Sequence, residues 1–297
     1  MNPISFWDSR TESLQTEAVF GGDALRWLYG TRAGKLLSSS LLNRPWFSRL
    51  YGSWQDTPWS ARKIEHFVRE YGIAMDDYEP GPFRTFNEFF IRRFKPGRRP
   101  FTSDPQALPA FAEARYLSFD RLDPTERFPI KGIALNAAEL LGSESQARPF
   151  AGGPAWIARL CPVDYHRYHY PDGGTTSSSY SLHGLLHSVS PIALRTKPDI
   201  LITNERKVSI LDTESLGRLA YVEVGAMSVG KIIQSHSELI AFKKGLEKGY
   251  FLFGGSTVIL LAEPGKWKLD PAALDRSREG LETFFPLGAQ IAQRLAE

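Results

Sequence analysis

Near its C-terminus the chain reads Phe251-Leu252-Phe253-Gly254-Gly255-Ser256-Thr257-Val258-Ile259-Leu260-Leu261, an apolar strand-like run broken by four small residues. A strand interior normally excludes paired glycines, because they lose entropy on folding and pack nothing. The break therefore indicates backbone that is approached closely or held in an unusual conformation. Because Gly255 has no Cβ to shield its carbonyl, the hydroxyl of Ser256 can attack that carbonyl. A bulge or a hairpin is the alternative.

The sequence on either side of this stretch predicts an α+β fold. Residues 1–97 have mainly helical spacing, with a helix starting at Thr57-Pro58 and a capping box at 85–88. From about residue 115 to 261, short apolar runs separated by turn residues predict strands, as in Ala155–Leu160, Ile192–Leu194, Ile200–Thr203, Val208–Leu211 and Leu219–Val224. The tail 271–295 returns to helical spacing. We expect a helical region over 1–100, followed by an antiparallel β-sandwich or barrel-like catalytic domain over 101–297.

Composition limits the class of protein. Hydrophobic residues make up 42% and charged residues 23% of the 297 residues, which is ordinary for a folded soluble protein. The single cysteine, Cys161, excludes an intrachain disulfide framework. No apolar stretch reaches the ~18 residues that suggest a membrane span, so any membrane contact is expected to be peripheral.

Charge is distributed unevenly along the chain, whose net charge is +3. Between residues 23 and 54, a net charge of +4 accompanies many leucines and aromatic residues; the basic residues are Arg26, Arg32, Lys35, Arg44 and Arg49. This mixture suits an interfacial helix on anionic lipid. A helical pair packed on its own core, with a solvated basic face, explains it equally well. No nucleic-acid-binding motif is present, so a nucleic-acid surface is disfavoured.

A second informative segment runs from residue 161 to 174 and places His166 and His169 three residues apart, between a proline and a Pro-Asp-Gly-Gly turn. A turn or bend would bring the two rings together, whereas a regular strand would send them to opposite faces. Acid-base chemistry beside Ser256, half of a metal site and ordinary structural histidines are the three interpretations. The spacing of Cys161 and the other histidines matches no recognised metal site, so no metal is expected.

These motifs together resemble the phosphatidylserine decarboxylase proenzyme family, almost from end to end. The resemblance rests on Phe-Asn-Glu-Phe-Phe at 86–90, Arg-Arg-Phe-Lys-Pro-Gly-Arg-Arg-Pro at 92–100, Ile-Lys-Gly at 130–132, Leu-Leu-Gly at 140–142, Asp-Tyr-His-Arg at 164–167 with His169, Asn-Glu-Arg at 204–206, Val-Glu-Val-Gly-Ala at 222–226, Lys-Gly at 244–245, and Gly-Tyr-Phe at 249–251 before Gly-Gly-Ser-Thr. No single motif would suffice, but their order is specific.

The resemblance implies a cofactor made from the chain itself. Ser256 would attack the Gly255 carbonyl to form an ester, and loss of the Ser256 Cα proton would cleave that ester by β-elimination. The new N-terminus would become a pyruvoyl group, so covalent pyruvate derived from Ser256 is the expected cofactor. The large and small subunits would be residues 1–255 and 256–297. The ketone would form a Schiff base with the substrate amine and accept the electrons released with carbon dioxide.

The resemblance also implies roles for individual residues. His169 would be the base for self-cleavage, and His166 would serve decarboxylation as a proton carrier. Thr257 would hold the turn or donate to the oxyanion, although strand propensity alone also explains it. The family has an Asp as the acidic partner of the base, and here Glu113 takes that position. Another register puts Phe111 there, and Asp120 and Asp123 are fallback candidates.

The implied reaction converts phosphatidylserine to phosphatidylethanolamine. Phosphatidylserine in anionic membranes is the expected partner, at the cytoplasmic face of a bacterial-type cell membrane, and homodimerisation is left open. Three alternatives compete: a pyruvoyl decarboxylase of free or modified amino acids, a Ser-His-Glu hydrolase that does not cleave itself, and an uncleaved lipid-binding protein. The basic and aromatic N-terminal region favours the phospholipid substrate.

Overall fold

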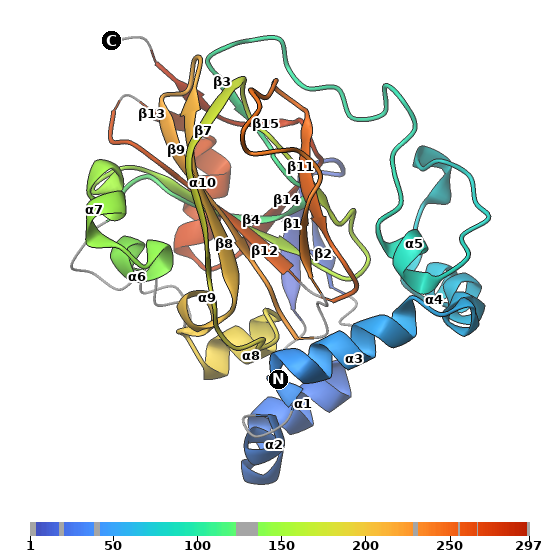
Figure 1. The fold of residues 1–297 in the computed structure, drawn as a ribbon. Coiled ribbons are helices and arrows are strands. Elements are labelled where there is room, and N and C mark those ends of the chain that lie inside the picture. The colour runs from blue at the N-terminus through green and yellow to red at the C-terminus, as the bar shows by residue number, and fades with distance from the viewer. Residues whose placement is uncertain are drawn as a thin grey trace.

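A nine-stranded sheet organises the chain in the computed structural model (Figure 1). The structure describes residues 4–17, 21–38, 42–122, 136–227, 231–254, 256–265 and 267–295; for residues 45 and 49 it describes the backbone alone. The strands lie in the order β2-β1-β14-β4-β5-β12-β9-β8-β7. Their bounds are β1 Ser5–Asp8, β2 Ser13–Thr16, β4 Ala114–Phe119, β5 Ala155–Leu160, β7 Gly174–Leu182, β8 Arg206–Thr213, β9 Arg218–Val224, β12 Ser256–Ala262 and β14 Glu282–Phe285.

Antiparallel pairing dominates this sheet, and β1 with β14 is a parallel pair. Two three-stranded sheets complete the β structure, in the orders β10-β11-β6 and β13-β15-β3. Their strands are β3 Ala107–Pro109, β6 Arg167–His169, β10 Ile232–Gln234, β11 Glu247–Phe251, β13 Trp267–Leu269 and β15 Gln290–Arg294. The described strands form no closed barrel, so the α+β prediction is confirmed and its barrel-like variant is not.

The centre of the large sheet is its most buried part. Every residue of β5 and β12 is buried, and these two strands pair in antiparallel register. Strands buried on both faces require continuous apolar sequence, and Val258–Leu261 supplies it. The sheet therefore gives the residues at the start of β12 a fixed frame.

Helices flank the sheet on several sides (Figure 1). They are α1 Gly22–Gly30, α2 Arg32–Leu37, α3 Pro45–Gln55, α4 Ile64–Tyr71, α5 Phe86–Phe90, α6 Ala137–Leu141, α7 Glu144–Ala147, α8 Pro191–Thr196, α9 Ile200–Thr203 and α10 Pro271–Arg278, with 3-10 turns at Pro58–Lys63, Met75–Asp77 and Arg148–Phe150. None of the described helices combines the length and apolar character that crossing a bilayer requires.

Local signals explain the N-terminal helices. The hydroxyl of Thr85 accepts from the Glu88 N–H at the start of α5, as the capping box predicts. Gly72 ends α4 in the left-handed conformation, which glycine adopts without a steric penalty. The helix predicted from Thr57-Pro58 therefore exists, but its first turns are a 3-10 helix.

Several predicted elements are wrong. The first sixteen residues contribute β1 and β2 to the large sheet, so the N-terminal region is not purely helical. The apolar runs at 192–194 and 200–203 are short helices, because three or four apolar residues fit either a buried helix or a strand. Only Pro271–Arg278 of the C-terminal tail is helical, and β14 and β15 follow it. In each case tertiary pairing decided what local spacing could not.

Candidate active site

Ser256 is the first residue of β12 and is completely buried. Its register partner on β5 is Leu160, and the next residue, Thr257, lies between Arg159 and Val224. Thr257 is also buried, and its hydroxyl finds no hydrogen-bond partner among the described residues. The predicted cleavage residue Gly255 lies outside the described residues. The sheet thus holds the candidate nucleophile and a second buried hydroxyl in consecutive positions of one strand, where side chains alternate between the two faces.

His166 is the histidine that meets Ser256. The Ser256 Oγ lies 3.4 Å from His166 Nδ1, and His166 Nε2 lies 2.8 Å from the carbonyl oxygen of Cys161. A carbonyl only accepts, so Nε2 carries the hydrogen and Nδ1 presents its lone pair to the hydroxyl. The contact therefore orients neutral His166 to take a proton from Ser256.

Burial and stacking fix the state of this imidazole. His166 is fully buried, and the ring of Phe90 stacks on it at a centroid distance of 3.8 Å. Burial lowers the pKa of His166 to about 3, outweighing the bond to Cys161, while Arg92 nearby lowers it further. The ring is thus neutral at physiological pH, and Nδ1 carries a lone pair rather than a proton.

The α5 helix also holds the chain that leads into Ser256. The backbone N–H of Phe253 donates to Asn87 Oδ1 at 3.0 Å, and the Phe253 ring packs edge-on against Phe86 and Phe90 at 5.0 Å each. Asn87 Nδ2 donates to Asp56 Oδ1 at 2.7 Å. One short helix thus contacts both the base and the loop before the nucleophile.

A buried charge network supports the turn that carries the Cys161 carbonyl. Asp164 Oδ2 accepts from the Cys161 N–H at 2.7 Å and from Arg115 at 2.6 Å. Glu17 bridges Arg115 and Arg159, with N–O distances of 3.1 and 2.6 Å. Burial opposes the ionisation of Glu17, but the two guanidinium groups outweigh it and lower the pKa to about 2.

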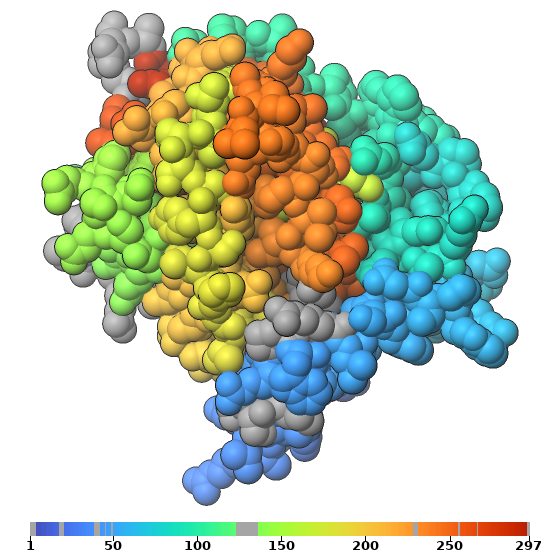
Figure 2. Space-filling model, viewed as in Figure 1, coloured from blue at the N-terminus to red at the C-terminus, as the bar shows by residue number. Residues whose placement is uncertain are grey.

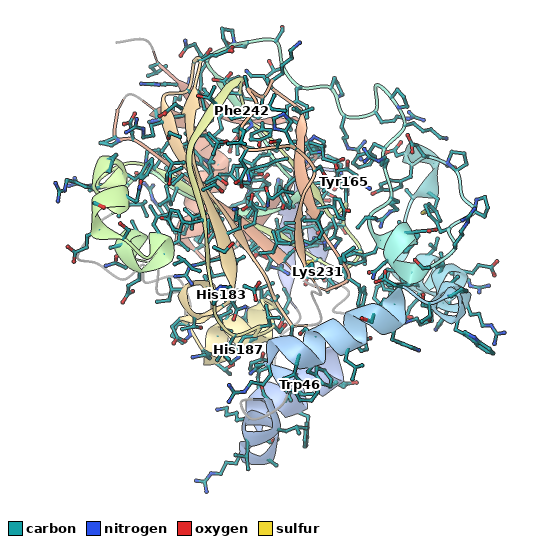
Figure 3. All side chains as sticks on the ribbon, viewed as in Figure 1. Trp46, Tyr165, His183, His187, Lys231 and Phe242 are labelled. Atoms are coloured by element: carbon teal, nitrogen blue, oxygen red, sulfur yellow. The ribbon has the colours of Figure 1, made fainter. Side chains whose placement is uncertain are left out.

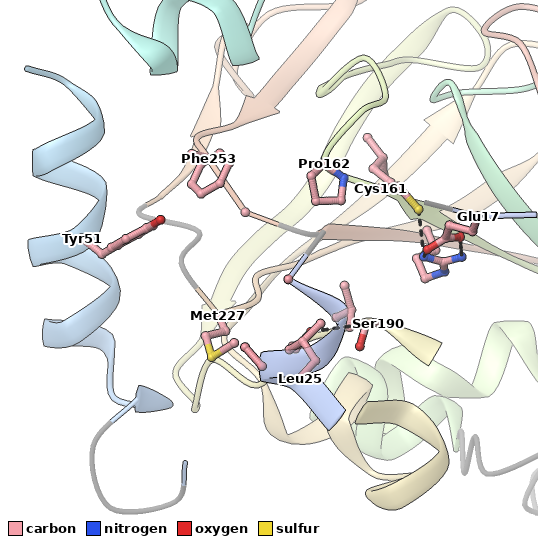
Figure 4. Close-up of a pocket in the computed structure, with 15 residues that line it drawn as sticks. Glu17, Leu25, Tyr51, Cys161, Pro162, Ser190, Met227 and Phe253 are labelled. Carbon is pink, nitrogen blue, oxygen red and sulfur yellow. Dashed lines mark hydrogen bonds and ion pairs between the residues drawn. The ribbon is translucent and has the colours of Figure 1, made fainter. Parts of the chain in front are cut away.

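A cavity of about 210 Å³ adjoins the loop before Ser256 (Figure 4). Tyr51 of α3 faces Phe253 across it, and Gly254 forms part of its wall. The far wall includes Leu25, Met227 and Ser190, and the charged end carries Glu17, Arg159 and Cys161. The cavity is mostly apolar with a few polar groups, which is typical of small-molecule sites.

His169 lies on β6 and has different partners. Its Nδ1 donates to the carbonyl oxygen of Gly245 at 2.9 Å, and its Nε2 is 3.3 Å from the hydroxyl of Tyr165. Burial lowers its pKa, while the bond to Gly245 opposes the shift. No hydrogen bond joins His169 to Ser256 among the described residues. The structure therefore brings one of the two predicted histidines to the hydroxyl, and that one is His166.

Among the described residues, no hydrogen bond or ion pair joins Glu113 to His169. Its carboxylate accepts two hydrogen bonds from Arg99, at 2.6 and 3.0 Å, and a third from the Leu287 N–H at 3.2 Å. The predicted Glu113–His169 pair is thus absent from this structure, because a guanidinium fork satisfies both carboxylate oxygens. Phe111, the residue of the other register, accepts the His169 N–H through its carbonyl and buries its ring.

The fallback acids and the metal interpretation find no support. Asp120 pairs with Arg278 at an exposed position, and Asp123 lies outside the described residues. In the part of the chain that the structure describes, no group of three or more His, Cys, Asp or Glu side chains could hold a metal ion. The described residues therefore give no support to the interpretation of the histidine segment as half of a metal site.

Sequence reasoning missed several residues that build the site. Asn87 and Phe90 were visible only as part of the Phe-Asn-Glu-Phe-Phe motif, and the Cys161 carbonyl carries no side-chain signal at all. Their roles depend on which strands and loops meet, which spacing along the chain does not encode.

Comparison with known proteins identifies close relatives. Residues 86–278 match the phosphatidylserine decarboxylase family. A phosphatidylserine decarboxylase proenzyme of Clostridium perfringens strain SM101 is 36% identical over 293 residues, which are 98% of this chain and 100% of that protein. Proenzymes of the same name from Clostridium botulinum strain 657 and Clostridium tetani are 35% and 36% identical over 293 residues, which are 98% of this chain and 99% and 98% of those proteins.

Proposed function

The chain belongs to the phosphatidylserine decarboxylase family, and from this premise we propose that it decarboxylates phosphatidylserine to phosphatidylethanolamine with a pyruvoyl group made from Ser256. The observation that carries the proposal is the contact between the buried Ser256 Oγ and His166 Nδ1, next to a cavity lined by Gly254. A family member requires both a reactive serine at this position and space beside it.

The residues around position 256 fit a pyruvoyl group. The His166 lone pair faces position 256 and can contact the new ketone or the substrate, and the hydroxyl of the next residue, Thr257, is buried without a partner among the described residues. When formed, the group supplies a ketone that binds the substrate amine and accepts the electrons released with carbon dioxide. The chain's own residues supply the binding site, the proton transfers and the exclusion of water.

Self-cleavage begins with the Ser256 hydroxyl. A base removes its proton, Oγ bonds to the Gly255 carbonyl carbon, and the C–N bond between the two residues breaks as the Ser256 nitrogen gains a proton. Removal of the Ser256 Cα proton then breaks the Cβ–Oγ bond and releases residues 1–255 with a carboxylate. The remaining dehydroalanine takes up water and loses ammonia. Thr257 is a candidate donor to the oxyanion of the first step.

The two histidines divide the proton transfers. Contact and neutral charge favour His166 as the group that takes and returns protons at position 256, including the proton that replaces the lost carboxylate. The resemblance assigns the self-cleavage base to His169, which would have to leave Gly245 and Tyr165 to reach Ser256. The contact in the structure makes His166 a second candidate for that base.

We propose further that the N-terminal helices dock on anionic lipid at the cytoplasmic face of the cell membrane. Trp46, Leu50 and Trp54 follow each other at intervals of four on α3 and are 53%, 66% and 49% exposed. The helices α1 to α3 lie together at the lower end of the view, away from most of the sheet, and Trp46 lies in this layer (Figures 2 and 3). Exposed aromatic residues beside basic ones suit a lipid interface, and Tyr51 of α3 also lines the cavity.

Vesicle co-sedimentation tests the docking. Replacing Arg32, Lys35 and Arg44 with glutamine should weaken binding to anionic vesicles, and binding should fall as the Debye length shrinks toward about 3 Å at 1 M salt. The control replaces Arg218, Lys268 and Arg278, which are also exposed but lie outside the N-terminal helices. If both sets weaken binding equally, the protein binds anionic lipid through its overall positive charge, and the N-terminal helices are not a specific docking surface.

Denaturing electrophoresis with intact mass tests the decarboxylase itself. The wild-type chain should give two fragments, the smaller one lighter by one ammonia than residues 256–297 beginning with serine. Ser256→Ala should give one full-length, inactive chain. A hydrolase or an uncleaved lipid-binding protein would give one species in both cases. Release of carbon dioxide from phosphatidylserine but not from free serine separates the phospholipid reaction from that of an amino-acid decarboxylase.

A further inference from the structure

Asn87 joins three parts of the molecule through one side chain. Its Oδ1 accepts the Phe253 N–H, three residues before Ser256, while its Nδ2 donates to Asp56 Oδ1 and, at 3.4 Å, to the Gly52 carbonyl. Gly52 belongs to α3 and Asp56 caps its C-terminus. Asn87 itself is 2% exposed. A buried amide that uses both of its ends this way fixes the distance between α3 and the loop before the nucleophile.

We propose that Asn87 is a positioning residue, which sets the path of the chain into Ser256 and couples that path to α3. The proposal deepens the proposed function, because the loop matters only if Ser256 reacts. Self-cleavage needs Oγ and the preceding carbonyl at attack distance, and a misplacement of about 1 Å can slow such a step about 10²-fold.

The surroundings of Phe253 support a positioning role. The Phe253 ring packs against Tyr51 of α3 at 5.9 Å, and Phe86 and Phe90 close the other sides. The preceding Phe251 N–H donates to the His166 carbonyl at 3.0 Å. The loop is therefore tied to the base on one side and to Asn87 on the other, and Gly254, with φ at 140°, follows immediately. Glycine permits that backbone conformation without fixing it, so contacts such as the Asn87 hydrogen bond restrain the loop.

A charge swap between positions 87 and 56 provides the test. Asn87→Asp alone places two carboxylates where a donor and an acceptor now meet, so self-cleavage should slow by about 10²-fold. Asp56→Asn alone keeps an acceptor for Asn87 and should cleave at the wild-type rate. The double variant restores a donor at 56 and an acceptor at 87, so it should regain most of the wild-type rate.

Lower pH adds a signature that simple loss of stability would not give. Protonation of one carboxyl restores an O–H···O bond in Asn87→Asp, so its cleavage relative to wild type should recover as the pH falls. The double variant should show no such recovery. Wild-type cleavage kinetics in Asn87→Asp, or a double variant as slow as Asn87→Asp, would overturn the proposal.

Hydrogen exchange keeps this proposal separate from the proposed function. In the uncleavable Ser256→Ala chain, the Phe253 amide should be protected, lose protection with Asn87→Asp and regain it in the double variant. Asp56→Asn serves as the matched control and should leave protection unchanged. Unprotected Phe253 in the parent chain would refute the role of Asn87, whereas failure of the wild-type chain to cleave would refute the proposed function alone.

Discussion

His166 and His169 stand three residues apart, yet their surroundings differ in the one respect that matters for chemistry. His166 has one nitrogen tied to a carbonyl and the other facing the Ser256 hydroxyl. His169 has both nitrogens engaged, with Gly245 and Tyr165. A ring with a free lone pair beside a nucleophile is ready to act, whereas a ring with two partners must first give one up. Position in the motif and contact geometry therefore favour different residues as the base.

Replacing each histidine by alanine gives the largest expected effect. His166→Ala should lose about 10²–10⁴-fold in decarboxylation, because proton transfer at position 256 loses its carrier. Its effect on self-cleavage decides the base. If the contact in the structure is the reacting one, His166→Ala stays full length and His169→Ala matures.

The opposite outcome would assign the two roles as the resemblance does. A matured but inactive His166→Ala and an uncleaved His169→Ala would mean that His169 reaches Ser256 after rearrangement. Fragment appearance over time after expression measures the first step, and carbon dioxide release by matured protein measures the second. Because only matured protein can decarboxylate, a variant that stays full length reports on self-cleavage alone, and the loss in decarboxylation is measured on whichever variant matures.

Glu113 is the predicted acidic partner of His169, and the structure pairs it with Arg99 instead. If its work is to hold Arg99, then Glu113→Gln and Arg99→Gln both break this ion pair, and each should destabilise the chain by about 1–3 kcal/mol in a chemical denaturation curve. Self-cleavage rates of the two variants should then agree. Strong slowing by Glu113→Gln alone would instead identify the carboxylate as the partner of His169, as the sequence predicts.

The sequence predicted the parts of this molecule that local pattern decides. The apolar runs of β5, β9 and β12 and the capping box at Thr85 are all present. It also singled out Ser256 and His166, which the structure brings into contact.

Non-local contacts account for the remainder. The strand β1 pairs with β14, almost at the other end of the chain, and no local pattern reports such a partner. Arg99, in a loop, donates hydrogen bonds to Glu113, and the Asn87 side chain accepts one from Phe253, which is 166 positions away in the sequence. Side-chain partners of this kind depend on the assembled fold. This is why Glu113, the predicted acidic partner of His169, pairs with Arg99 in the structure.

Acid should reveal the buried state of His166. Its pKa is about 3 in the folded chain and about 6.5 when unfolded, so the unfolded chain binds more protons between these values. The stability that comes from burying the neutral ring is complete above pH 6.5 and falls by about 1.4 kcal/mol for each unit below it. In the uncleavable Ser256→Ala chain, the midpoint of urea unfolding should be lower at pH 5 than at pH 7. Adding His166→Asn to this chain should make that difference smaller.

Other groups set the control for this pH dependence. His169 and His187 also have lowered pKa values because they are buried, so some acid sensitivity should remain after the change at His166. Glu17 changes the pH dependence of stability only below its ordinary pKa of 4.5, because its pKa in the folded chain is about 2. His66→Asn, at an exposed position on α4, is the matched substitution outside the buried site. A protonated His166 in the folded chain would make His166→Asn behave like this control.

Thr257→Val is expected to have the smallest effect on stability and still tests the site. Because the Thr257 hydroxyl is buried without a partner, replacing it with a methyl group of similar size breaks no hydrogen bond, and the unfolding free energy should stay equal or rise by up to about 1 kcal/mol. The strand would tolerate valine equally well. If the hydroxyl donates to the oxyanion beside His166, self-cleavage should nevertheless slow, by up to about 10²-fold. A variant that is as stable as wild type and cleaves as fast would make Thr257 a strand residue and leave proton transfer by a histidine as the main catalytic contribution at Ser256.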